Sequence, residues 1–130
     1  MRFAERGGTS NIVLVEADAY DLGKHVRAPA DHVILANVFH GVPDRLRLAR
    51  AVRGVLKPGG LFAIISWYAR PREETTVLGE PLGPATQLRM APEQTIESVA
   101  AGSFCASAIR LMCRRILSST AKRTSRIFWR

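Results

Sequence analysis

The chain has 130 residues and a formal net charge of +8, with 47% apolar and 23% charged residues. This composition favours one soluble α/β domain with a real core over a disordered chain. With no apolar run near the roughly 20 residues of a membrane span, no secretory signal and only two cysteines, the sequence indicates a cytoplasmic protein without a disulfide framework or a zinc site.

The first predicted element is a strand at residues 12–15. Its four residues, Ile-Val-Leu-Val, are all apolar and show no alternation. Such a run is typical of a strand in a parallel sheet that helices cover on both faces. Polar residues follow it as far as Asp31.

A strand–helix–strand unit follows. Residues 32–38 are apolar through their centre and predict a second buried strand, and Asp44 offers an N-cap for the helix behind it. That helix ends near Lys57, and Pro58 with the two glycines behind it forces a turn. Residues 61–67 then predict a third buried strand. Strands that alternate with helices point to a doubly wound α/β sheet.

The next segment, residues 70–90, is rich in proline and glycine and predicts a long irregular excursion. Pro92 suits the first turn of a helix, Ile96 and Val99 form its apolar stripe, and Gly102 closes it.

The charge is uneven along the chain. Residues 1–105 hold 12 Lys/Arg and 11 Asp/Glu, a net of +1, whereas residues 106–130 hold 7 Lys/Arg and no acid, a net of +7. We therefore divide the chain into a partial domain, residues 1–104, and a basic tail, residues 105–130. The apolar residues of the tail fall on one helical face and predict a helix: Ile109, Met112, Cys113, Ile116 and Leu117. The abrupt change of composition suggests, as a hypothesis, a frame change in the gene near codon 104.

Three stretches, in order, resemble class I S-adenosylmethionine-dependent methyltransferases that act on small molecules. They are residues 15–22, 31–44 and 55–61, and residues 89–94 are typical of one bacterial branch. The resemblance spans residues 3–104. It implies that a methyl group passes from S-adenosylmethionine to a small-molecule acceptor by in-line displacement.

The resemblance also implies a cofactor site. In the family, an Asp after the third strand accepts a hydrogen bond from the adenine amino group, and the next residue offers its backbone N–H to the ring; Asp18 and Ala19 match these positions. Asn37 lies beyond the carboxyl end of the next strand, where open α/β sheets bind ligands, and is a third cofactor candidate.

His40 and Trp67 lie at the same edge of the predicted sheet and are candidates for binding the acceptor. Each of these candidates has a plainer alternative: Asp18 as a solvated residue at a strand end, His40 as a loop histidine that caps the following segment, and Trp67 as core packing. We find no convincing acid/base pair, assign no catalytic residue and expect no metal.

Two features of the family are missing. The glycine-rich loop after its first strand and the acidic residue that holds the ribose have no match before Ile12. The resemblance therefore implies an incomplete doubly wound Rossmann-like sheet that lacks its first two strands, and we expect little or no activity from this chain. The antiparallel hairpin that ends the family's sheet has no match after Cys105 either.

Two other functions remain as alternatives. The first is a non-catalytic remnant whose basic tail binds nucleic acid or an anionic membrane, although cations without a groove or an aromatic platform are more typical of solvent-exposed charge. The second is a nicotinamide-dependent Rossmann oxidoreductase, which residues 18–21 and the turn at residues 56–60 disfavour.

Overall fold

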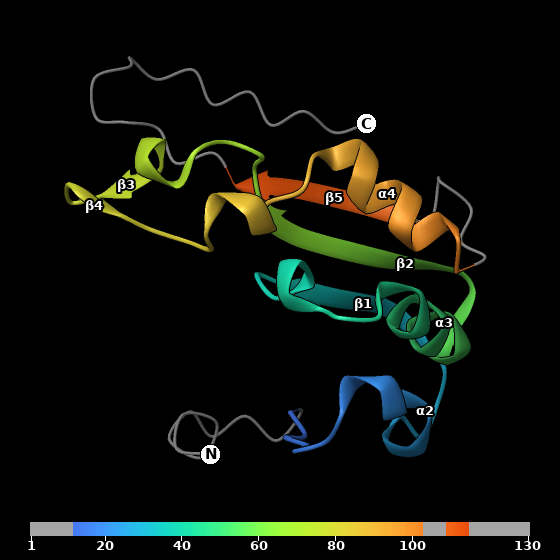
Figure 1. The fold of residues 1–130 in the computed structure, drawn as a ribbon. Helices are drawn as coiled ribbons and strands as arrows, with labels where there is room; N and C mark the ends of the chain where they lie inside the picture. The colour runs from blue at the N-terminus through green and yellow to red at the C-terminus, as the bar shows by residue number, and fades with distance from the viewer. Residues whose placement is uncertain (1–11, 103–108, 115–130) are drawn as a thin grey trace.

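A computed structural model describes residues 12–102 and 109–114 of the chain. They form a mixed α/β fold around a three-stranded sheet in the order β1-β2-β5, and both strand pairs are parallel (Figure 1). The sheet and its crossover helices are β1 (Ala30–Ala36), α3 (Arg45–Val55), β2 (Leu56–Trp67), α4 (Pro92–Ala100) and β5 (Ile109–Arg114). The smaller elements are η1 (Ala19–Asp21), α2 (Leu22–His25), η2 (Phe39–Gly41), η3 (Arg72–Glu74), β3 (Thr76–Val77), β4 (Glu80–Pro81) and η4 (Thr86–Leu88).

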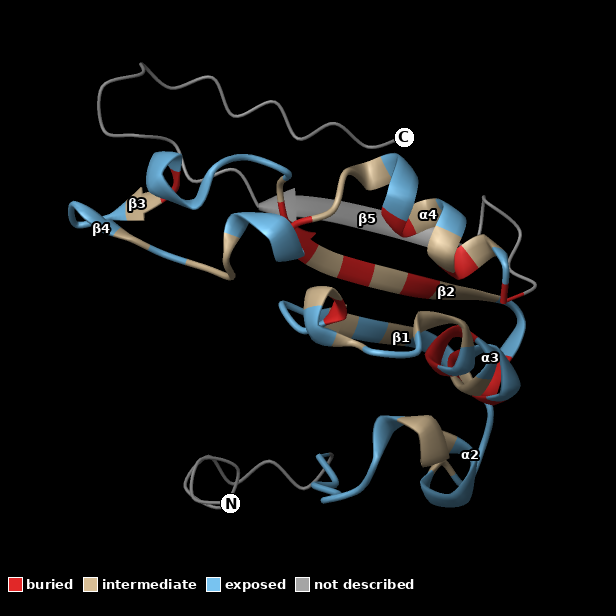
Figure 2. Cartoon of the chain, in the orientation of Figure 1, coloured by how far each residue is buried: buried red, intermediate tan, exposed pale blue. Residues whose placement is uncertain are grey.

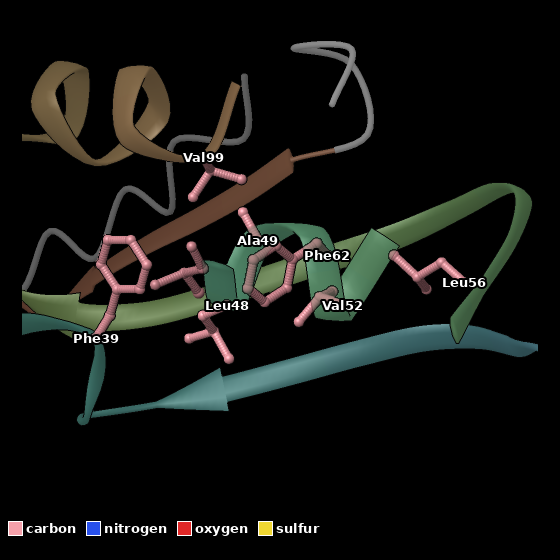
Figure 3. Packing of buried hydrophobic residues seen from close by; sticks show 8 residues of the cluster. Phe39, Leu48, Ala49, Val52, Leu56, Phe62 and Val99 are labelled. Atoms are coloured by element: carbon pink, nitrogen blue, oxygen red, sulfur yellow. The ribbon is translucent and has the colours of Figure 1, made fainter. Parts of the chain in front are cut away.

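The core lies on one face of the sheet, between β2 and the two crossover helices. Phe62 and Ile64 of β2 belong to the same buried cluster as side chains of α3 and α4. In it, Val99 of α4 lies near Ala49 of α3 (Figure 3). The buried cluster is completed by side chains of η2, α3 and the start of β2: Phe39, Leu48, Val52 and Leu56. Each of the two helices is amphipathic, so it buries one apolar stripe against the sheet and leaves its other side exposed.

The helix predicted after Asp44 is confirmed. Asp44 caps α3 by accepting a hydrogen bond from the backbone N–H of Arg47 at 2.9 Å. The turn predicted behind this helix takes the form of a bulge inside β2. Ala30 pairs with Leu56 and His32 with Leu61, so one residue of β1, Asp31, lies opposite four residues of β2, 57–60. Gly59 takes a φ of 77° in this bulge.

The strand predicted at residues 12–15 is wrong. These residues are exposed and belong to no strand. A β-strand needs a partner for its backbone hydrogen bonds, and none of the described strands lies beside them.

The second strand forms as β1, but its predicted burial on both faces is wrong. Burial alternates along β1, with Val33 and Leu35 packed against the core and Ile34 66% exposed (Figure 2). The reason is that α3 and α4 pack on the same face of the sheet. Within residues 12–102, no helix covers the opposite face of β1.

The helix predicted across the start of the tail is wrong for residues 109–114. They form β5, which pairs in parallel with β2 from Phe62↔Ile109 to Trp67↔Arg114. The free edge of β2 offers a row of backbone hydrogen bonds, and this pairing outweighs the local helical period. The rest of the predicted basic tail, residues 105–108 and 115–130 with Ile116 and Leu117, lies outside the described residues.

The excursion and the last predicted helix are confirmed. Between β2 and α4 the chain makes two 3-10 turns and the two-residue ribbon β3–β4, which extends away from the main sheet (Figure 1). Helix α4 begins at Pro92 and ends just before Gly102. Across residues 12–102 and 109–114, no helix is long and apolar enough to cross a membrane.

Candidate functional site

A cavity of about 460 Å³ opens beside the carboxyl end of β1. Its size falls within the ~300–1,000 Å³ of small-molecule pockets, and its position is the one where open α/β sheets bind ligands. Its walls are mostly apolar and come from η1, the end of β1, η2 and α3: Ala19, Tyr20, Leu35, Asn37, Val38, His40, Gly41, Val42, Pro43 and Leu48.

Asn37 forms the corner of this cavity. Its backbone N–H donates to the carbonyl oxygen of Ile65 at 2.8 Å, which continues the β1–β2 ladder by one bond. Its φ of 58° lies in the left-handed region, where asparagine is among the few non-glycine residues found. This conformation turns the chain sharply out of the sheet and into η2.

Asp18 stands next to the cavity and shapes the turn that enters it. One carboxylate oxygen accepts the backbone N–H of Tyr20 at 2.8 Å and so caps η1, whose first residue is Ala19. The side chain is exposed, and an ionised carboxylate has two oxygens that accept hydrogen bonds. Asp18 can therefore hold the turn and still accept a bond from a ligand.

Tyr20 was not among the predicted site residues, yet it lines the cavity and fixes η1 to α3. Its hydroxyl accepts the backbone N–H of Asp44 at 3.1 Å, and the guanidinium of Arg47 lies 4.4 Å from the centre of its ring. An aromatic residue directly after the Asp-Ala pair is the sequence signal that could have identified it.

His40 lines the same cavity from η2. Its Nδ1 is buried and has no hydrogen-bond partner, and its carbonyl oxygen accepts a bond from Arg45 Nη2 at 3.3 Å. An imidazole with an unused ring nitrogen beside a cavity is suited to bind a polar group of a ligand.

Trp67 lies apart from this cavity, at the end of β2. It is buried, the guanidinium of Arg89 lies 5.4 Å from its ring centre, and Gly83 packs against its ring. The structure therefore brings Ala19, Asn37 and His40 to one cavity and Asp18 beside it, and places Trp67 elsewhere.

Among the described residues, two charged groups have shifted pKa values, and neither lies at the first cavity. Lys57 donates to Asp31 at 2.7 Å at the start of β1, and this bond and charge lower the pKa of the carboxyl. Burial lowers the pKa of the Arg89 guanidinium, an effect that Glu73 opposes and Arg72 reinforces. Within the described residues, no three His, Cys, Asp or Glu side chains gather as a metal site would require.

The comparison with known families matches the part of the chain that builds the first cavity. A family model described as a methyltransferase domain matches residues 1–64, which include Asp18, Ala19, Asn37 and His40 and exclude Trp67. No curated protein and no solved structure matches the chain. The parallel α/β sheet is consistent with this family's Rossmann-like fold. Residues 1–64, at the start of the chain, therefore match a methyltransferase domain, in agreement with the predicted resemblance to class I S-adenosylmethionine-dependent methyltransferases.

Proposed function

We propose that the first cavity holds the adenosine part of S-adenosylmethionine and that the protein transfers the methyl group to a small-molecule acceptor. One observation carries the proposal. Of the four residues that lie in stretches matching the family's motifs, three line a single cavity at the carboxyl end of β1, and the fourth, Asp18, stands beside it. Residues without a common role would be scattered over the surface.

The residues present suit the adenine end of this cofactor. Asp18 keeps a carboxylate oxygen for the amino group, and Ala19 brings its backbone to the cavity. The apolar walls, among them Leu35 and Leu48, offer a flat aromatic ring the contacts that such pockets commonly provide. Asn37 adds polar groups at the corner nearest the sheet.

The chemistry requires mainly positioning. The bound cofactor supplies a methyl carbon on a sulfonium, which an acceptor attacks in line. Holding two reactants in this geometry can contribute about 7–11 kcal/mol of the barrier. His40 is the candidate for contact with the acceptor, because it lines the first cavity. Trp67 lies apart from that cavity and packs against Gly83 and Arg89.

The methionine end of the cofactor has no matching cradle in this sequence. The 130 residues contain no two glycines separated by one residue, so no G-x-G-x-G loop exists among them. We infer an incomplete family sheet that lacks its first two strands, and we expect these residues on their own to bind the cofactor weakly and to show little or no activity.

Equilibrium dialysis of the full chain against labelled S-adenosylmethionine tests the proposal. We expect saturable binding that S-adenosylhomocysteine displaces and NAD does not. A preference for NAD would instead support a nicotinamide-dependent oxidoreductase. Absence of any saturable binding would contradict the proposed role of the first cavity in these residues.

A further inference from the structure

A second cavity, of about 610 Å³, lies between the start of α3 and one face of α4. It shares no lining residue with the first cavity. Its walls combine two arginines with residues of α4 and of the segment before it: Arg45, Gln87, Leu88, Arg89, Met90, Gln94, Glu97, Ser98 and Ala101. Neither the methyl donor nor the acceptor of the proposed reaction accounts for it.

Arg89 is the more deeply buried of the two arginines, only 7% exposed. Its Nη2 donates to the hydroxyl of Thr75 at 2.8 Å and to the carbonyl oxygen of Leu82 at 3.0 Å, and its Nε donates to the carbonyl oxygen of Pro84 at 3.1 Å. These bonds and the ring of Trp67 beneath fix the guanidinium in place. Its Nη1 is buried and has no hydrogen-bond partner.

Arg45 enters the same cavity from the first turn of α3. Its Nη2 donates to the carbonyl oxygen of His40 at 3.3 Å, and its guanidinium lies 5.7 Å from the ring centre of Phe39. Its Nε is also buried without a partner. Two guanidinium groups thus line one cavity, and each has one buried nitrogen without a hydrogen-bond partner.

Neither guanidinium forms an ion pair with a carboxylate of the described residues, whose ion pairs are Lys24–Asp21 and Lys57–Asp31. Glu97 lines the cavity but is exposed and stands in no ion pair with either arginine. A buried donor without a partner costs free energy. An anion between the two arginines that accepts hydrogen bonds from these nitrogens removes this cost.

We propose that this second cavity binds the carboxylate or phosphate group of a small-molecule ligand between Arg45 and Arg89. A guanidinium suits both groups, because its N–H groups donate charge-assisted hydrogen bonds to carboxylate and phosphate oxygens. Trp67 and the carbonyls of the 82–84 segment are positioning groups that hold Arg89 ready. The inference does not rest on the proposed methyl transfer, since anion binding needs neither the methyl donor nor the first cavity.

The side-chain Nε–H resonances of Arg45 and Arg89 in the ¹⁵N-labelled full chain give a direct readout. The chain is titrated with inorganic phosphate and separately with acetate, in a buffer free of both, with chloride holding the ionic strength constant. We expect saturable shifts of these two resonances with at least one of the anions, and tighter binding of phosphate or of acetate identifies the group that the cavity prefers. Shifts that chloride reproduces, or none, would overturn the proposal.

Three variants sharpen the test. Arg45→Gln removes a cation but leaves the bonds that Arg89 makes to its loop, so the fold should persist while affinity falls about 10- to 100-fold. Arg53→Gln, at an exposed position of α3 outside both cavities, makes the same change in net charge and should leave affinity unchanged. Glu97→Gln removes a negative charge from the wall and should tighten binding. Equal losses in Arg45→Gln and Arg53→Gln would show a diffuse effect of net charge and refute the site.

Discussion

The carboxylate of Asp18 has two tasks in the proposed site, since it caps the N–H of Tyr20 and offers its other oxygen to the adenine amino group. Asp18→Ala removes both and should weaken S-adenosylmethionine binding by about 1–3 kcal/mol, the cost of an unpaired group in a binding site. Asp18→Ser keeps an oxygen that can bond the N–H of Tyr20, so it should preserve the turn and still lose most of this affinity. Equilibrium dialysis measures both variants.

Asp21→Ala is the matched control for Asp18. It removes a partly exposed carboxylate three residues further on, which pairs only with Lys24 at 3.0 Å in the described part of the chain. The affinity of this variant for S-adenosylmethionine should equal that of the unchanged protein. Should Asp18→Ser bind as well as Asp21→Ala, Asp18 has no contact with the cofactor.

The place of a residue in the first cavity could be predicted where a short motif indicates it. It could not be predicted where it depends on a contact with a distant part of the sequence. Asn37 and His40 follow β1, so the parallel topology predicted their place at the carboxyl end of the sheet. Asp18 and Ala19 follow a predicted strand that does not form, and only their match to the family's motif indicated them. The position of Tyr20 directly after Ala19 could have indicated its place at the cavity, but its bond to Asp44, 24 residues away, follows from no local pattern. The same holds for Arg89, whose burial depends on the fold of the preceding loop.

Among the elements, the start of β1 is tied to the bulge of β2 by the Asp31–Lys57 pair at 2.7 Å. Because Lys57 lowers the pKa of Asp31 in the folded state, the pair stabilises the fold above the ordinary carboxyl pKa of 3.8 and loses this effect as pH falls through the lower, folded-state value. Asp31→Asn should therefore reduce the melting temperature slightly at neutral pH, as expected for an exposed pair. Melting curves between pH 2 and pH 7 should show the difference vanish on acidification; a difference that grows in acid would contradict this account.

The loop between β3–β4 and α4 depends on a glycine under Trp67. Gly83 has a φ of 93°, and a Cβ added there would lie 2.7 Å from the indole ring. Gly83→Ala should destabilise the protein by at least about 1 kcal/mol through backbone strain alone, and by more through the clash. Gly23→Ala, in α2 with open space around the new methyl group, should be neutral or stabilising. Urea unfolding compares the two, and equal stabilities would mean that Gly83 is not packed as described.

The same elements show where sequence patterns stop being sufficient. Helix α3 followed from a cap and an apolar stripe, which are local, and both are present. Whether residues 12–15 and 109–114 form strands depends instead on a neighbouring strand with which they can pair. The first has an apolar run but no strand beside it, whereas the second has a helical pattern but lies along the open edge of β2. Pairing across the sheet decided both outcomes against the local pattern.

At the scale of the whole molecule, both helices that cross over the sheet cover one face, so the two faces should differ sharply in their contribution to stability. Ile64 is fully buried against α3 and α4, and Ile34 on the neighbouring strand points to the opposite face. Ile64→Ala should cost about 2–5 kcal/mol, as deletion of a core side chain does. Ile34→Ala, the same substitution at a side chain 66% exposed, should cost at most about 0.5 kcal/mol. Denaturant unfolding at several protein concentrations measures both.

The difference between Ile34→Ala and Ile64→Ala also shows whether anything covers the face of the sheet opposite α3 and α4 in solution. If Ile34→Ala proves as costly as Ile64→Ala, the face is covered by something beyond residues 12–102 and 109–114. A loss that depends on protein concentration would then identify a second copy of the chain, because only an intermolecular contact makes stability depend on concentration. A loss that does not would identify a segment of the same chain. If Ile34→Ala costs little unfolding free energy at every protein concentration, the sheet is stabilised by packing against α3 and α4 alone. One layer of helices is then enough to keep β1 in the sheet.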